Sequence, residues 1–286
     1  MKLIKIHPAI HILYYLTLIC FGMLYNNIYY LATFIVLILI LLYLEGALSK
    51  LKDLFKIFIP FALIIIILNP LCSRVGVTKI YLFGNFYITL EALIFGIIGS
   101  ISLFVVFMIL LSYNEEVSYQ EMLYIFSKKL PNVSMIIVMA LRYIPLLKCR
   151  IKDFLKINSL DIEENNFSNK IEIGAKAFGG VIGWSLEDSM ITAKSMKSRG
   201  YNITKRSSYL SFKFRTVDYG LLALIIIASA VCIYGLFLGV GRISIYPQFN
   251  FAFDKSPIDM FYIAFVVLLL PKILFEIRER LYWVGL

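Results

Sequence analysis

Six long apolar stretches dominate this sequence of 286 residues. Each approaches the roughly 20 residues that a helix needs to cross the ~30 Å hydrocarbon core of a bilayer. With 60% hydrophobic and only 16% charged residues, the composition also differs from that of a soluble globular protein. The sequence therefore predicts an all-α polytopic membrane protein. The predicted spans are residues 9–25, 28–45, 54–71, 88–112, 217–239 and 257–275.

The segment between the fourth and fifth spans is too rich in charge to lie in a membrane. Residues 113–215 carry sixteen of the 28 Lys and Arg side chains, and their apolar residues recur at helical spacing. We therefore predict an amphipathic cytoplasmic region between two membrane regions. The first membrane region is residues 1–112, with four spans, and the second is residues 216–286, with two spans.

The distribution of positive charge predicts the orientation, because cytoplasmic loops retain Lys and Arg. Only four of the 28 Lys and Arg lie in the two predicted outer loops, and the other 24 lie on the opposite side. Both termini are therefore expected in the cytoplasm of a bacterial cell. The same asymmetry accounts for the net charge of +10 by topology and anionic lipid, so no nucleic-acid partner is expected. The four outer-loop residues are Arg74, Lys79, Arg242 and Lys255.

Two amphipathic helices are predicted within the cytoplasmic region, at residues 131–157 and 171–199. Pro145 lies inside the first and is expected to kink it near Arg142, because proline removes one backbone hydrogen bond. The second helix is interrupted by glycines that favour close helix crossing. The simplest arrangement is an antiparallel hairpin. The glycines are Gly179, Gly180 and Gly183.

The second of these helices ends in an arrangement suited to binding another protein. Gly200 is a good left-handed cap, so Arg199 is expected at the helix end with five free donors for a carboxylate. Small neighbours keep the surrounding surface shallow, and Met196 adds a soft apolar contact. An ordinary helix terminus carries the same Arg-Gly pair, so the residues alone leave both interpretations open. The small neighbours include Ala193 and Ser198.

Several short motifs, taken in order along nearly the whole chain, resemble the transmembrane (T) component of energy-coupling factor (ECF) transporters, which import vitamins and metal ions into bacteria. No single motif decides the resemblance, but their order and spacing are specific. They are His7-Pro8, Leu68-Asn-Pro-Leu71 followed by Arg74-Val-Gly-Val-Thr78, Thr89-Leu-Glu-Ala-Leu93, Ala140-Leu-Arg-Tyr-Ile-Pro-Leu-Leu147, and the segment from Glu187 to Tyr201.

The resemblance implies a coupling role. In this family two cytoplasmic coupling helices, each ending in an x-Arg-Gly motif, dock into two ATP-binding-cassette (ABC) ATPases, and a separate membrane S component binds the substrate. The second motif matches at Ser198-Arg199-Gly200. The first is expected at Asn158 and Ser159, where both the arginine and the glycine are missing. The resemblance further implies that ATP and Mg²⁺ bind to the ATPases, and that this chain holds no cofactor, no metal ion and no catalytic residue.

Two other functions were weighed against this one. A membrane-embedded lipid-modifying enzyme would need paired acids, histidine clusters or an activated nucleophile near the bilayer surface, and the chain has two histidines and isolated acids. A self-sufficient channel or carrier usually has charged residues deep within its spans, whereas Glu91 lies in the first turn of its span. The sequence does not name the imported substrate, because selectivity belongs to the S component.

Overall fold

The computed structural model describes residues 7–72, 78–83, 86–159, 167–201, 203, 212, 214–241 and 259–284. The chain forms two compact units. Met1–Glu121 and Phe212–Leu286 make up the first, here named the membrane unit, and Met122–Ser211 makes up the second, the helix-pair unit. Each is described by itself.

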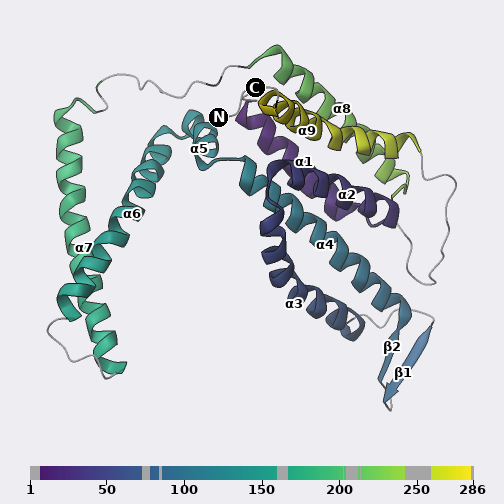
Figure 1. Cartoon of the computed structure of the whole chain (residues 1–286), viewed down its shortest axis with the longest axis horizontal. Helices are drawn as coiled ribbons and strands as arrows, with labels where there is room; N and C mark the ends of the chain where they lie inside the picture. Colours follow the sequence, from purple (N-terminus) through teal and green to yellow (C-terminus); the bar gives the residue numbers. More distant parts are fainter. Residues whose placement is uncertain are drawn as a thin grey trace. The chain divides into compact units, whose positions relative to one another are not determined.

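The regular elements among the described residues are helices, except for one two-stranded hairpin (Figure 1). Among the described residues, the membrane unit contains six helices that pack on one another and one antiparallel hairpin, while α5 begins in this unit and ends in the next. Its elements are α1 (Pro8–Leu24), α2 (Ile28–Glu45), α3 (Leu48–Cys72), β1 (Lys79–Phe83), β2 (Phe86–Thr89), α4 (Leu90–Glu116), α8 (Thr216–Phe237) and α9 (Met260–Val284). The others are α5 (Tyr119–Lys129), α6 (Pro131–Ser159) and α7 (Phe167–Ser198).

Six of the described helices are long and apolar enough to cross a membrane. Five of them agree with predicted spans. The sixth is Pro131–Ile157 of α6, which the sequence placed in the cytoplasm, and it is the least apolar of the six. The first predicted span corresponds to α1, which at 17 residues is shorter than these. The structure thus confirms an all-α polytopic membrane protein, and length and composition alone do not separate α6 from the spans.

The third predicted span, residues 54–71, ends within one residue of α3 in the structure. The residue before a proline is usually pushed out of the helical region. Nevertheless α3 runs without a break to Cys72, and it contains both Pro60 and a buried Pro70. Residues 73–77, which belong to the adjoining family-like motif, lie outside the described part of the chain.

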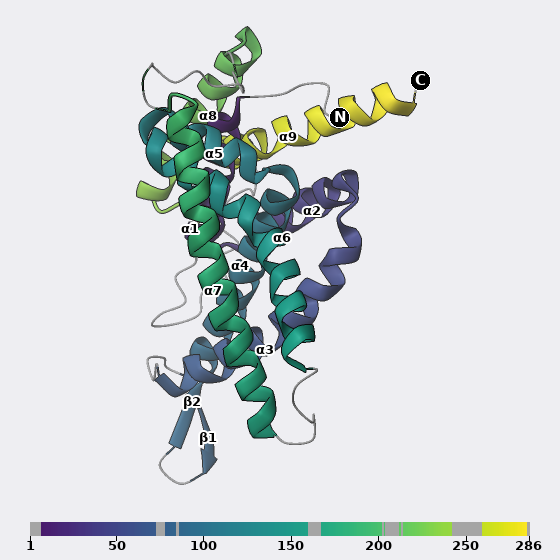
Figure 2. The same cartoon turned by 90° about the vertical axis from the view of Figure 1, so that its left-hand side faces the viewer.

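Aromatic side chains fill the core of the membrane unit. Phe265 of α9 contacts Phe34 of α2, with ring centroids 5.0 Å apart, and both side chains are fully buried. Tyr25 and Tyr30 stack with their centroids 4.5 Å apart. Ser102 of α4 donates a hydrogen bond of 2.6 Å to the carbonyl oxygen of Gly22 on α1. These contacts tie helices from both ends of the sequence into one bundle. Figure 2 shows the same elements in a second view.

Close approach at Gly96 joins α3 to α4. A Cβ atom at this position would lie 3.3 Å from the backbone of Ile66, so any larger residue would have to push the two helices slightly apart. At the start of α4, Glu91 is buried and accepts a hydrogen bond of 3.2 Å from the backbone N–H of Thr78, just before β1. This acid therefore links the residue just before the hairpin to the first turn of α4.

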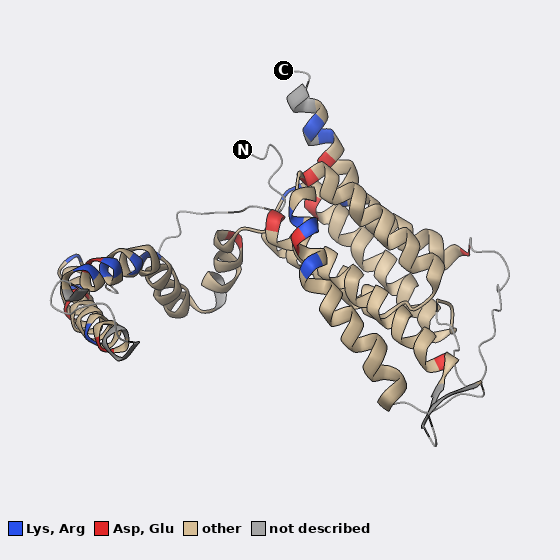
Figure 3. Cartoon of the chain, turned by 60° about the horizontal axis from the view of Figure 1, so that its bottom comes forward, with Lys and Arg blue, Asp and Glu red and all other residues tan. Residues whose placement is uncertain are grey.

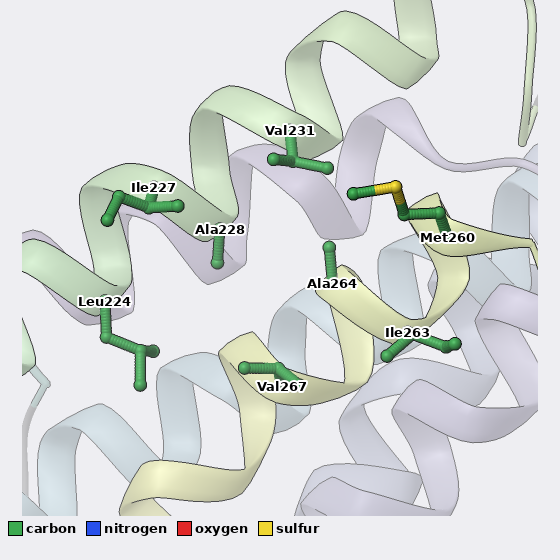
Figure 4. Close-up of a pocket in the computed structure, with 8 residues that line it drawn as sticks. All are labelled: Leu224, Ile227, Ala228, Val231, Met260, Ile263, Ala264 and Val267. Carbon is green, nitrogen blue, oxygen red and sulfur yellow. The ribbon is translucent and has the colours of Figure 1, made fainter.

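Charged side chains of the membrane unit gather at one end of its helices (Figure 3). The long middle parts of these helices carry almost no charged side chains, as a hydrocarbon environment requires. Eight apolar side chains of α8 and α9 enclose a groove of about 490 Å³ that also fits such an environment (Figure 4). They are Leu224, Ile227, Ala228, Val231, Met260, Ile263, Ala264 and Val267.

Candidate coupling site

Four contacts define how α6 and α7 pack in the helix-pair unit. Tyr143 donates a hydrogen bond of 2.5 Å to a carboxylate oxygen of Asp188 and lies 3.3 Å from the hydroxyl of Thr192. In the other two contacts, the guanidinium of Arg150 lies 4.9 Å from the centre of the Trp184 ring, and Phe154 packs against Gly180. As the α6 number rises the α7 number falls, so the helices are antiparallel, as the sequence predicted.

The glycines of α7 do not share one role. A Cβ atom at Gly180 would lie 2.7 Å from the ring of Phe154, so this residue permits the close crossing. At Gly179 and Gly183 a Cβ atom would meet no described atom within 4 Å. The prediction that all three serve the crossing was therefore wrong for these two, because they point away from α6.

Pro145 lies inside α6, which continues as one helix on both sides of it. Its neighbour Tyr143 holds α7, while Arg142 and Pro145 are themselves exposed. A hinge at this point stays a prediction. Tyr143 and Asp188 were not singled out from the sequence, although Tyr143, Arg150 and Phe154 recur at intervals of seven and four, the spacing of one helix face.

The end of α7 is closed by a Schellman motif. The N–H of Tyr201 donates to the carbonyl oxygen of Met196 at 3.1 Å, and the N–H of Gly200 donates to that of Lys197, also at 3.1 Å. Gly200 has φ +79°, in the left-handed region that favours glycine. The predicted cap is thus confirmed, and its cause is this pair of backbone hydrogen bonds.

Arg199 is exposed at this capped end. Ala193 and Ser198 are exposed as well, and Met196 is half-buried. The hydroxyl of Ser198 donates to the carbonyl oxygen of Ser195 at 2.9 Å, so this small side chain is turned back onto its own helix. A guanidinium at a helix C-terminus is favoured by the helix dipole and can bind a carboxylate through two parallel hydrogen bonds.

The other predicted end lies at the far side of the hairpin. Asn158 and Ser159 are the last two residues of α6, and the side chains of both lie outside the described part. The antiparallel register places residue 158 beside residue 176 of α7, which is 23 residues before Arg199. At a rise of 1.5 Å per residue the two ends are about 35 Å apart. Figure 1 shows the end of α6 and the end of α7 at opposite ends of the pair.

An exposed apolar stripe runs along each helix of the pair. On α7 the stripe includes Phe178, which is 63% exposed, and Leu186, which is 60% exposed. On each helix the stripe is rotated about the helix axis from the residues that contact the other helix. The rotation is about a quarter to a third of a turn, and its sense along the chain is the same on both helices. Because the helices are antiparallel, both stripes lie on one side of the hairpin, here named the apolar face. Its α6 residues are Val133, Ile137, Ile144, Ile151 and Leu155, and its α7 residues are Phe178, Ile182 and Leu186.

Residues 2–210 match the family described as CbiQ, cobalt transport protein. The chain belongs to this CbiQ cobalt transport family. The match covers α1 to α7 and therefore includes the whole helix pair and its capped end. Membership makes the chain a membrane component of a transport system, as the resemblance predicted. A search of curated proteins finds no match. Among the described residues of this CbiQ member, no group of three or more His, Cys, Asp or Glu side chains could hold a metal ion.

Proposed function

We propose that this chain is the coupling subunit of an ECF-type ABC importer, which passes ATP-driven movement of two cytoplasmic ATPases to an S component. The observation that carries the proposal is the placement of the two predicted anchors at opposite ends of one helix pair. About 35 Å is roughly the diameter of a small domain, so two separate proteins can dock without overlap. Membership in a transport family supports the same conclusion.

The ATPases are assigned to the ends of α6 and α7. Arg199 is exposed, and Gly200 fixes the direction of the chain behind it, so a carboxylate in a groove of the ATPase can approach. The end at Asn158 and Ser159 lacks the arginine, and we expect it to bind its ATPase more weakly. ATP and Mg²⁺ bind to these partners, while this chain supplies neither a catalytic residue nor a cofactor site.

The S component is assigned to the apolar face of the helix pair. A surface that exposes residues such as Phe178 and Leu186 is unusual next to water and typical of an interaction site. We place α6 along the cytoplasmic membrane surface rather than across the bilayer, because a single helix with Arg142, Lys148, Arg150, Lys152 and Lys156 is costly to insert. Both termini are then cytoplasmic.

The proposed mechanism is mechanical. ATP binding closes the two ATPases and draws the ends of α6 and α7 together. The hydrogen bond of Tyr143 with Asp188 and the Gly180 crossing hold the middle of the helix pair together. The movement of the two ends therefore bends the parts of α6 and α7 that lie beyond these contacts. The S component, loaded with a metal ion or a vitamin, then tilts and releases its cargo into the cell.

The test is substitution of Arg199. We expect Arg199→Glu to remove the ATPase at this end, because a desolvated charge contact is replaced by repulsion, which weakens binding by about 30-fold or more. Lys197→Glu is the matched control, since it changes charge in the same exposed last turn but lies outside the x-Arg-Gly motif. Co-purification of tagged chain with the ATPases measures the effect. Normal co-purification and uptake with Arg199→Glu would show that the assigned role is wrong.

The two ends are compared with alanine. Because the first motif lacks arginine, Asn158→Ala is expected to weaken ATPase binding much less than Arg199→Ala. Both variants are measured in the same co-purification. Equal losses would show that the two ends act alike despite their sequences.

A further inference from the structure

We propose that a buried ion pair between Glu116 and Lys272 sets the direction in which the chain leaves the membrane unit toward the helix pair. Both residues then act as positioning residues for coupling. The inference rests on the proposed coupling function, because it concerns how movement of the helix pair reaches the spans. Glu116 is the last residue of α4, and the chain enters the helix-pair unit six residues later.

The geometry of the pair is that of a fixed contact. The Nζ atom of Lys272 on α9 lies 2.5 Å from a carboxylate oxygen of Glu116, and the two side chains are only 8% and 5% exposed. A second carboxylate, that of Glu276, lies 3.8 Å from the same ammonium. Charges removed from water in this way separate with difficulty, because neither has a solvent shell to replace its partner.

Two further helices meet at this point. Ser112, one turn before Glu116 on α4, donates a hydrogen bond of 2.9 Å to the carboxylate of Glu45 at the end of α2. The same hydroxyl lies 2.9 Å from the phenol oxygen of Tyr15 on α1. Glu45 is also close enough to interact electrostatically with Lys272 and Glu116. The last turn of α4 is therefore held by polar contacts to α1, α2 and α9 together.

The neighbouring residue provides a contrast. Glu115 pairs with Lys50 of α3, but these side chains are 30% and 59% exposed. An exposed pair contributes little, because water and salt screen it and can replace either partner. Two successive glutamates thus hold two different helices, and only Glu116 does so out of solvent.

The start of α8, within the membrane unit, is also fixed, by different contacts. The ring of Phe214, just before α8, stacks on His7 with centroids 3.9 Å apart. Asp218 in the first turn of α8 accepts a hydrogen bond of 2.9 Å from the N–H of Arg215 and one of 3.4 Å from the N–H of His7. The helix pair is therefore connected to the membrane unit through two ends that are each fixed within that unit. A loose end of α4 would absorb movement that a fixed end passes on.

The experiment measures the spread of positions of the helix pair relative to the membrane unit. Cys20 on α1 and Cys149 on α6 are both exposed and carry spin labels, Cys72 is replaced by serine, and Cys232 is buried and stays in place. The full chain is placed in lipid nanodiscs, alone and with its co-expressed partners, and the distance between the labels is measured by pulsed electron paramagnetic resonance. Each sample is recorded with and without Mg-ATP.

The matched variants are Glu116→Gln and Glu115→Gln. We expect the parent chain and Glu115→Gln to give one dominant distance, which shifts with Mg-ATP in the complex. Glu116→Gln should lose the single dominant distance while ATPases still co-purify, and its fold is retained because Glu276 stays beside Lys272. The exchanged pair, Glu116→Lys with Lys272→Glu, should narrow the distribution again in part.

An equally narrow distribution in Glu116→Gln and in the parent chain would overturn the inference. A lower thermal midpoint without broadening would do the same, since it would show a stabilising contact and no positioning role. If no ATPase binds the parent chain, the proposed function fails. In that case the chain alone in nanodiscs still tests the positioning role, because the width of the distance distribution is compared between the parent chain and Glu116→Gln without partners.

Discussion

The membrane unit and the helix-pair unit use apolar side chains in opposite ways. In the membrane unit the large aromatic residues face one another, as Phe34 and Phe265 do. In the helix-pair unit large apolar residues such as Phe178 and Leu186 lie on an open face. Smaller residues of α7, such as Ala177 and Val181, are buried, and the two helices also touch through the Tyr143–Asp188 pair, the Arg150–Trp184 contact and the Gly180 crossing. A unit with an open apolar face gains less of its stability from internal packing. The comparison teaches that the bundle is stabilised by its own core, whereas the helix pair leaves apolar surface for the partners that we propose.

The largest expected effect concerns the aromatic core of the membrane unit. Phe34→Ala should destabilise the chain by about 3 kcal/mol, because it opens a cavity beside Phe265. Phe178→Ala, at a site 63% exposed, should change the free energy of unfolding by less than about 0.5 kcal/mol. Denaturant unfolding in detergent micelles measures both.

The order of the two variants should reverse when binding of the S component is measured in place of stability. Phe178→Ala should reduce co-purification of the S component, while the folded fraction of Phe34→Ala should bind it normally. Equal destabilisation by the two substitutions would contradict the division into a closed and an open unit.

The next effect concerns the crossing of α6 and α7. Gly180→Leu should destabilise the helix pair by about 2 kcal/mol, because the new side chain must displace the ring of Phe154. Gly183→Leu is the control, since a Cβ atom there meets no described atom within 4 Å. Hydrogen exchange of the amides of α6 and α7 reports this stability. If the amide hydrogens of the two variants exchange at the same rates, the crossing does not depend on Gly180.

The smallest effect concerns the cap of α7. Gly200→Ala should cost about 1 kcal/mol, because φ +79° crowds a Cβ atom against its own backbone. Asn tolerates this conformation better, so Gly200→Asn should cost less. We expect ATPase binding to fall in the same order, since fraying of the last turn moves Arg199. Titration of purified ATPase onto each variant measures it, and unchanged binding by Gly200→Ala would separate the cap from the binding site.

The sequence predicted features that depend on neighbours along the chain. The left-handed Gly200, the long apolar helices and the antiparallel pair follow from local composition and period, and the structure has them. The start of α3 at Leu48, six residues before the predicted span, was not predicted, because the charged residues there resemble a surface segment. The different roles of Gly179 and Gly180 depend on the rotation of α7 against α6, which spacing alone leaves open.

The contacts at the end of α4 were out of reach for a different reason. Glu116 and Lys272 lie 156 positions apart in the sequence, and nothing in the sequence around either one indicates the other. Tyr143 and Asp188 were likewise within quoted family motifs, yet their hydrogen bond requires the register of two helices. Long-range polar pairs of this kind are decided by tertiary packing.

The most direct test of the coupling role is the composition of the complex that this chain forms in its native membrane. Native mass spectrometry of material purified through a tag on the chain should show one copy of it, two ABC ATPase subunits and one small membrane protein. The Arg199→Glu variant should lose at least one ATPase. A chain that is isolated from native membranes without any ATPase, and transports substrate by itself, would contradict the account.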